Sequence, residues 1–165
     1  MRRRILIVAM IVVLLLAFAG WWFSPTQVVQ RRCDSFFNVI SFREQQAPAA
    51  RHAQGLKLAD YLDRDIAISA NELPEEIESP VSRGELQALF SAASNACNFI
   101  AITDRKFESI GIAGEDATVQ ARVKVAIGHP EGDHGLSGTH RVMLSWHRTN
   151  QVWVLTNVAW EKIAP

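Results

Sequence analysis

Histidines gather in one part of this chain, and they are the first residues whose type and spacing suggest chemistry. Four of the five histidines lie between His129 and His147, and Asp133 lies in the same stretch. Zinc and copper take converging imidazole and carboxylate ligands, so His129, Asp133 and His134 form a candidate metal site. Their spacing matches no established metal signature, and the loop contains three glycines, Gly132, Gly135 and Gly138. We therefore expect a polar hairpin loop here, without a resident metal or other cofactor.

Aromatic side chains are the second group that could have a functional role, because they could stack on a ligand. The candidates for lining a pocket are Phe90, Trp146, Trp153 and Trp160. Aromatic residues on a sheet more often pack in the core, and we expect packing to account for most of them. The sequence contains no nucleophile elbow, zinc-protease motif, phosphate-binding loop or dinucleotide fingerprint.

The two cysteines of the chain are Cys33 and Cys97. Each lies on the apolar stripe of a predicted helix, and the domain is predicted below to be exported to an oxidising compartment. We therefore predict that they form a disulfide. It would close a loop of about 64 residues, for which chain entropy gives roughly 4 kcal/mol of stabilisation. The alternative is two buried free thiols, since free cysteine is itself a favoured core residue.

Four successive antiparallel strands, predicted between Arg105 and Ile163, are the elements that must position most of these residues. The clearest runs from Ala117 to Ile127, where apolar and polar residues alternate with the period of two typical of a half-buried strand. The last strand is apolar on both faces, so we expect both of its faces to be covered.

The turn of the last hairpin is predicted at Thr149–Asn150, because asparagine tolerates a positive φ. This register places Trp146 opposite Trp153 on one face of the sheet. By parity, Val123 is expected near Val142 in the preceding pair.

Helices are predicted on either side of a short strand, to cover the sheet. An amphipathic helix of about five turns follows Pro25, with apolar residues at helical spacing from Val29 to Ile40. A shorter helix is predicted around Leu56 to Leu62, after a connection at Gln46–Gly55. A strand is predicted at Asp65–Ser69. The third helix begins with the capping-box pattern of Ser82 and Glu85, and its apolar stripe reaches Ile100. We expect this third helix to be the main cover of the sheet.

The N-terminal segment predicts a membrane anchor. Residues Ile5 to Phe23 form an uncharged run of 19 residues preceded by Arg2–Arg4, close to the ~20 residues that span a bilayer. The arginines favour a cytoplasmic tail at 1–4, a transmembrane helix at 5–23 and a periplasmic or extracellular domain at 24–165. A signal peptide cleaved after Ala19 is the alternative, and it would export the domain as well.

The net charge of the chain argues against nucleic acid as a partner. The chain has 17 basic and 17 acidic residues, and without Arg2–Arg4 it has 14 basic and 17 acidic, a net charge of −3. This mildly acidic domain has no electrostatic footprint for nucleic acid.

The order of these elements resembles the nuclear transport factor 2-like (NTF2-like) superfamily, which includes ketosteroid isomerase and SnoaL-type cyclases. The similar local sequences are Gly114–Val119, entering the second meander strand, and Arg148–Leu155, across the last hairpin. The resemblance covers Pro25 to Ile163. It implies an α+β, cystatin-like cone of three helices packed on a curved, mainly antiparallel sheet, with a pocket inside.

The same resemblance leaves function open, because the superfamily contains both enzymes and binding proteins. Isomerase-type members have a tyrosine and acidic residues that converge in the pocket. Tyr61 is the only tyrosine of this chain, and neither Asp63 nor Asp65 maps onto the family's catalytic base. If the chain were such an enzyme, Asp63 or Asp65 would be the candidate general base, and Tyr61 or His140 the candidate hydrogen-bond donor.

The sequence shows no such convergence, so we predict a membrane-anchored extracytoplasmic domain that binds a small apolar molecule or another envelope protein. An isomerase, cyclase or dehydratase is the alternative. A homodimer through the sheet is a further expectation, against which the polar outer positions argue.

Overall fold

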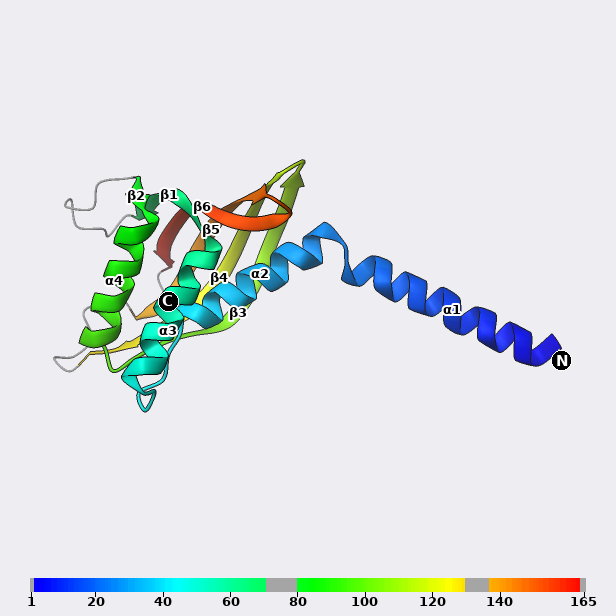
Figure 1. Ribbon diagram of the computed structural model, residues 1–165, viewed down its shortest axis with the longest axis horizontal. Coiled ribbons are helices and arrows are strands. Elements are labelled where there is room, and N and C mark those ends of the chain that lie inside the picture. The colour runs from blue at the N-terminus through cyan, green and yellow to red at the C-terminus, as the bar shows by residue number, and fades with distance from the viewer. Residues whose placement is uncertain (1, 71–79, 130–136, 164–165) are drawn as a thin grey trace.

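The computed structural model describes residues 2–70, 80–129 and 137–163, and it has an α+β architecture (Figure 1). The helices are α1 (Arg2–Trp22), α2 (Pro25–Ile40), α3 (Pro48–Leu58) and α4 (Arg83–Ala96), with a 3₁₀ helix η1 (Ala59–Tyr61). The strands are β1 (Leu62–Ala70), β2 (Val81–Ser82), β3 (Phe99–Ala113), β4 (Asp116–Gly128), β5 (Gly138–Thr149) and β6 (Val152–Ile163). They form one curved sheet in the order β2-β1-β6-β5-β4-β3, in which only the β1–β6 pair is parallel.

The predicted four-strand meander is confirmed as β3 to β6, but its first strand begins earlier than predicted. β3 starts at Phe99, paired with Gly128 at the end of β4, and the Asn98 amide donates to the Gly128 carbonyl. The preceding helix ends at Ala96, with Cys97 already extended. Ile100, which continues the apolar stripe of the predicted helix in the sequence, therefore belongs to strand β3 and not to the helix.

The last hairpin turns one residue later than predicted. Asn150 and Gln151 both have positive φ values, 50° and 65°, which is the two-residue arrangement that matches the twist of a hairpin. Trp146 therefore pairs with Leu155, and not with Trp153. The β4–β5 pair is displaced in the same way. Because each of these partners changes by two positions, the residues of β4, β5 and the first part of β6 keep their predicted faces.

A β-bulge in β6 corrects the expectation that this strand is covered on both faces. The register shifts so that Thr156 is an extra residue. Before the bulge Trp153 and Leu155 point into the core, and after it Val158 and Trp160 face the interior. The apolar residues before and after the bulge thus lie on the same face of the sheet. The β6 residues on the opposite face are exposed or half-buried.

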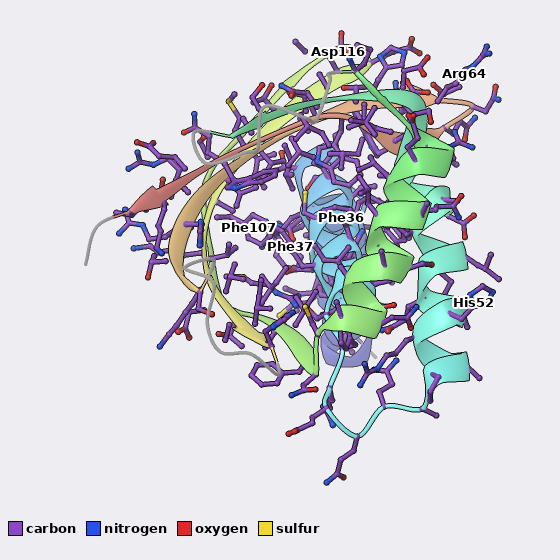
Figure 2. The ribbon with its side chains drawn as sticks, turned by 90° about the vertical axis from the view of Figure 1, so that its left-hand side faces the viewer. Phe36, Phe37, His52, Arg64, Phe107 and Asp116 are labelled. Atoms are coloured by element: carbon purple, nitrogen blue, oxygen red, sulfur yellow. The ribbon has the colours of Figure 1, made fainter. Side chains whose placement is uncertain are left out.

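The main cover of the sheet is α2, and not α4 as predicted. Four α2 residues are buried, at the helical spacing read from the sequence: Val29, Cys33, Phe36 and Phe37. In Figure 2, Phe36 and Phe37 lie between α2 and the curved sheet, whereas His52 lies on the outer side of α3. Only Phe90 and Ser94 are buried on α4.

The capping box that starts α4 is confirmed. The Glu85 amide donates to Ser82 Oγ at 3.3 Å, and the Ser82 amide donates to Glu85 Oε2 at 2.8 Å. The predicted connection at 46–55 is wrong in part, because Pro48 begins α3 and residues 48–55 are helical. Proline suits the first turn of a helix, where its missing amide hydrogen is not needed.

The predicted disulfide is absent, and both cysteines are free thiols. Cys33 is fully buried in the middle of α2, whereas Cys97 follows the last residue of α4. Helix α3 packs against both α2 and α4. Guanidinium nitrogen Nη1 of Arg51 on α3 donates to the carbonyls of Ser94 and Cys97 at 2.9 and 3.1 Å, which ties α3 to the end of α4.

Helix α1 extends away from the body of the protein (Figure 1), and its large apolar side chains from Met10 to Trp22 are exposed. No described residue of α1 belongs to the buried core. Among the described residues no single helix meets the length and hydropathy requirements for spanning a membrane. The pair Met10–Trp22 and Pro25–Ile40 meets them jointly, with a bend of 56°.

Candidate ligand-binding site

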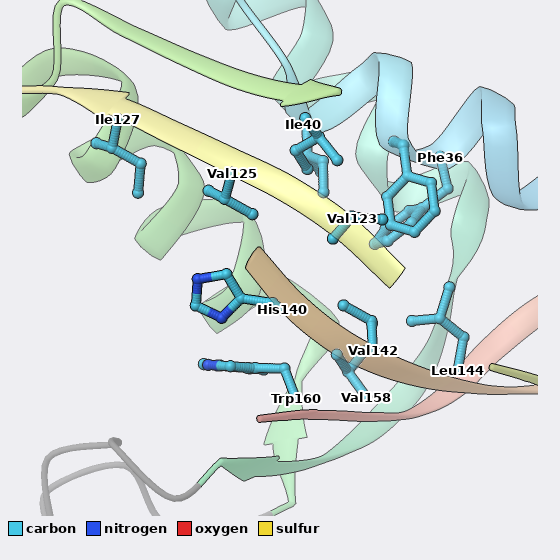
Figure 3. A pocket seen from close by; sticks show the side chains of 12 residues that line it. Phe36, Ile40, Val123, Val125, Ile127, His140, Val142, Leu144, Val158 and Trp160 are labelled. Carbon is cyan, nitrogen blue, oxygen red and sulfur yellow. The ribbon is translucent and has the colours of Figure 1, made fainter. Parts of the chain in front are cut away.

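An apolar cavity of about 290 Å³ lies between α2 and the inner face of the meander (Figure 3). Its wall comes from α2 and from all four meander strands. The lining residues are Phe36, Phe37, Ile40, Ile102, Val123, Val125, Ile127, His140, Val142, Leu144, Val158 and Trp160.

The local sequence explains why these side chains converge. The alternation in β4 directs Val123, Val125 and Ile127 to the inner face. The bulge in β6 brings Val158 and Trp160 to the same face. The apolar stripe of α2 closes the cavity from the other side.

His140 is the one polar residue in this wall, apart from the indole of Trp160, among the residues that the structure describes. Its side chain is 4% exposed, and it is the cross-strand partner of Val123. Figure 3 shows its ring beside that of Trp160 at one end of the cavity. We call this end, bounded by Ile127, His140 and Trp160, the mouth. It lies where β4 ends and β5 begins.

A second apolar cavity, of about 350 Å³, adjoins the first under α4 and β1. Both cavities are lined by Phe36, Ile40, Val158 and Trp160. The second is also lined by Phe90, on α4. The interior of the cone is therefore only partly filled by side chains.

Of the four aromatic candidates, two line the cavities and two do not. Phe90 and Trp160 line cavity walls. Trp146 and Trp153 are core residues, 1% and 4% exposed, and Trp146 packs edge-on against Phe36 with ring centroids 5.9 Å apart. The bulge separates Trp160 from the other two tryptophans, and the sequence spacing gives no sign of it.

Tyr61 lies outside both cavity walls. Its ring packs beside that of Phe36, with the ring centroids 6.1 Å apart. The guanidinium of Arg32, a residue of α2, lies 4.0 Å from the centroid of the Tyr61 ring. Arg32 is held there because its Nε donates to the Trp153 carbonyl at 3.0 Å. This packing makes Tyr61 a structural residue.

The two candidate bases also lie away from the cavities. The Asp63 carboxylate accepts a hydrogen bond from the Arg64 amide at 2.7 Å, and Asp65 is exposed on the face of β1 opposite the buried Ile66. Within the described part of the chain, no carboxylate lines either cavity. The convergence of an acidic residue with Tyr61 or His140 is therefore not observed.

The candidate metal site is described only in part. His129 follows the end of β4, whereas Asp133 and His134 lie outside the described residues. Within residues 2–70, 80–129 and 137–163, no group of three His, Cys, Asp or Glu side chains is arranged to hold a metal ion.

Sequence reasoning missed the aliphatic part of the site. Val123, Val125 and Ile127 were assigned correctly to the inner face of their strand, but as core. No sequence signal distinguishes an apolar residue that fills a core from one that lines a cavity, because the difference depends on how closely the elements pack.

No protein-family model matches this sequence, and no curated protein is significantly similar to it. Solved structures do resemble it. An NTF2-like protein from Cytophaga hutchinsonii has a TM-score of 0.61 at 16% identity, covering 86% of this chain and 100% of that one. A proposed dehydratase from the NTF2-like family of Streptomyces avermitilis has a TM-score of 0.60 at 14% identity, covering 85% and 96%.

A proposed aromatic ring hydroxylase from Novosphingobium aromaticivorans is also similar, with a TM-score of 0.56 at 17% identity, covering 70% of this chain and 78% of that one. These similarities confirm the NTF2-like fold that the order of elements implied. At such identities they establish a fold and not an activity.

Proposed function

We propose that this NTF2-like domain binds a small, mainly apolar molecule in the cavity between α2 and the meander. The observation that carries the proposal is the cavity itself, about 290 Å³ of space whose described wall is apolar except at the mouth. A concave apolar site with few polar groups is the usual form of a small-molecule site. Filling it would remove apolar surface from water, which is the main driving force for such binding.

Binding is better supported than catalysis. Isomerase or dehydratase chemistry needs an acid or base within hydrogen-bond reach of the reacting atoms. In the described residues, the wall offers His140 as the only such group, and Asp63 and Asp65 lie elsewhere. Among the described residues, no carboxylate base of the kind expected for the enzymatic alternative lines this wall.

A hydrophobic fluorescent probe, N-phenyl-1-naphthylamine, tests binding directly. It would be added to a fragment of residues 24–165, which keeps every described core residue. We expect saturable fluorescence enhancement. Val125→Trp, which adds bulk to the cavity wall, should weaken probe binding at least tenfold. The matched change Val152→Trp, at a 47% exposed position, should leave it unchanged.

Circular dichroism would establish that both variants are folded. The proposal is contradicted if the folded wild-type fragment gives no saturable enhancement. It is equally contradicted if the folded Val125→Trp variant binds the probe as tightly as the wild type does.

We also propose that α1 anchors the domain to a membrane, with residues 1–4 in the cytoplasm and residues 24–165 outside it. The supporting features are the uncharged run of Ile5–Phe23, the preceding Arg2–Arg4 and the exposed apolar side chains of α1. At the end of α1, Arg31 donates to the Trp22 carbonyl at 2.7 Å and its guanidinium lies 4.2 Å from the Trp22 ring centroid.

Reporter fusions to Pro165 test the anchor. A reporter that works only in the cytoplasm should be inactive, and one that works only outside it should be active. The opposite pattern would show that the proposed topology is wrong.

A further inference from the structure

The two adjoining cavities indicate how large the ligand is. We infer that they form one chamber, and that the ligand has a hydrocarbon part of about twenty carbons that occupies both cavities at once. This inference rests on the proposed binding function and specifies the class of ligand.

The boundary between the cavities consists of side chains that line both of them. Phe36 and Ile40 contribute to it from α2, and Val158 and Trp160 contribute from β6. In Figure 3 the two α2 residues lie across the first cavity from the two β6 residues. Since each of the four side chains borders both volumes, the two cavities are at most one side chain apart.

The fold places this boundary where two elements change course. Ile40 is the last residue of α2, and the chain is already extended at Ser41. On the other side, the bulge in β6 brings Val158 to the inner face. Ile40 and Val158 are only partly buried, although they adjoin the core. The core therefore does not hold the side chains of this boundary tightly.

Helix α4 gives a second, independent observation. Its apolar stripe lines the second cavity through Leu86, Leu89, Phe90 and Ala93. Of these residues only Phe90 is buried, and Leu89 is 48% exposed. An apolar stripe of this width normally packs against a core. Here most of it faces the cavity, so a hydrocarbon chain in the second cavity would remove the stripe from water.

The volumes give the length of the chain. A methylene group is similar in size to a water molecule, which occupies about 30 Å³ in the liquid. The cavities, of about 290 and 350 Å³, therefore hold about ten carbons each. The described walls carry no Asp, Glu, Lys or Arg side chain. Because an unpaired charge is costly in such surroundings, the enclosed part of the ligand is uncharged.

The experiment compares a short probe with a long one. Diazirine analogues of 1-decanol and 1-eicosanol are added to the full chain in lipid nanodiscs. Photolabelling of peptides from α4, β4 and β5 is measured by mass spectrometry as a function of probe concentration. Partition of a given probe into the lipid is the same for every variant, so the deciding quantity is the change between variants.

Two variants each reduce one cavity. Val142 lines only the first cavity and Ala93 only the second. Val142→Phe and Ala93→Phe should each raise the half-labelling concentration of the long probe at least about tenfold, because part of its chain loses its apolar contacts. Each should leave the value of the short probe nearly unchanged, because the other cavity still accepts it.

Two controls accompany these variants. Ala92→Phe adds the same side chain at the exposed neighbouring position of α4, and it should affect neither probe. Labelling by the short probe in Val142→Phe and Ala93→Phe shows that each variant is folded and still has an open cavity.

A response of the long probe to only one of the two variants would overturn the inference, because the cavities would then be separate sites. Equal losses for the short and the long probe would overturn it as well. In both cases the proposed binding function would stand, because the cavity peptides are still labelled in the wild type. If neither probe labels these peptides in the wild type, the proposed binding function fails and this inference fails with it.

Discussion

Cys33 shows how strongly the interior of this domain controls a single side chain. The residue is fully buried in the middle of α2, and this burial raises the pKa of its thiol to about 12. Only the thiolate reacts with alkylating reagents. Cys97, by contrast, is half-buried at the end of α4. The two thiols should therefore differ in reactivity.

Alkylation with N-ethylmaleimide at pH 8 measures this difference. In exported protein kept without reductant, we expect labelling of Cys97 alone in the native state and of both cysteines after unfolding. The variant Cys97→Ser should remove native labelling. If the unfolded, unreduced protein has no reactive thiol, the cysteines are bridged and the arrangement of α2, α3 and α4 described above is wrong.

The residues that could do chemistry were easy to identify in the sequence, but their positions in the fold were not predictable from it. His140 and Trp160 line the cavity, whereas Asp65 faces solvent and Tyr61 packs under Arg32. Nearness in sequence says little about convergence, since neighbouring strand residues point to opposite faces.

At the scale of elements, regular patterns were predictable and local irregularities were not. The alternation in β4 and the helical stripe of α2 lie as the sequence indicates. The last hairpin turns one residue later than predicted, and this turn places Gln151 at a φ of 65°. A positive φ is uncommon for glutamine, and here the twist of the hairpin compensates for its cost.

The bulge at Thr156 has the largest consequence of these irregularities. Without it, Val158 and Trp160 would face outward if Trp153 and Leu155 faced inward. An apolar pattern on both faces of a strand can therefore mean two layers of cover or one layer with a bulge. The sequence alone does not choose between these two structures.

At the scale of the whole molecule, the anchor and the mouth lie at opposite ends of α2. Helix α1 joins the N-terminal end of α2 (Figure 1), whereas Ile40, near the mouth, is the last residue of α2. With α1 in a membrane, as proposed, the mouth would face away from the bilayer.

The most direct test of the central claim is to locate a bound probe by NMR, using residues 24–165 with ¹³C-labelled valine methyl groups and N-phenyl-1-naphthylamine. We predict intermolecular NOEs from the aromatic protons of the probe to the valines that line the cavity, which are Val123, Val125, Val142 and Val158. Val152 and Val154, on the other face of β6, should show none. NOEs confined to those two residues, or no NOE to any cavity valine at saturating probe, would contradict a ligand site inside the cone.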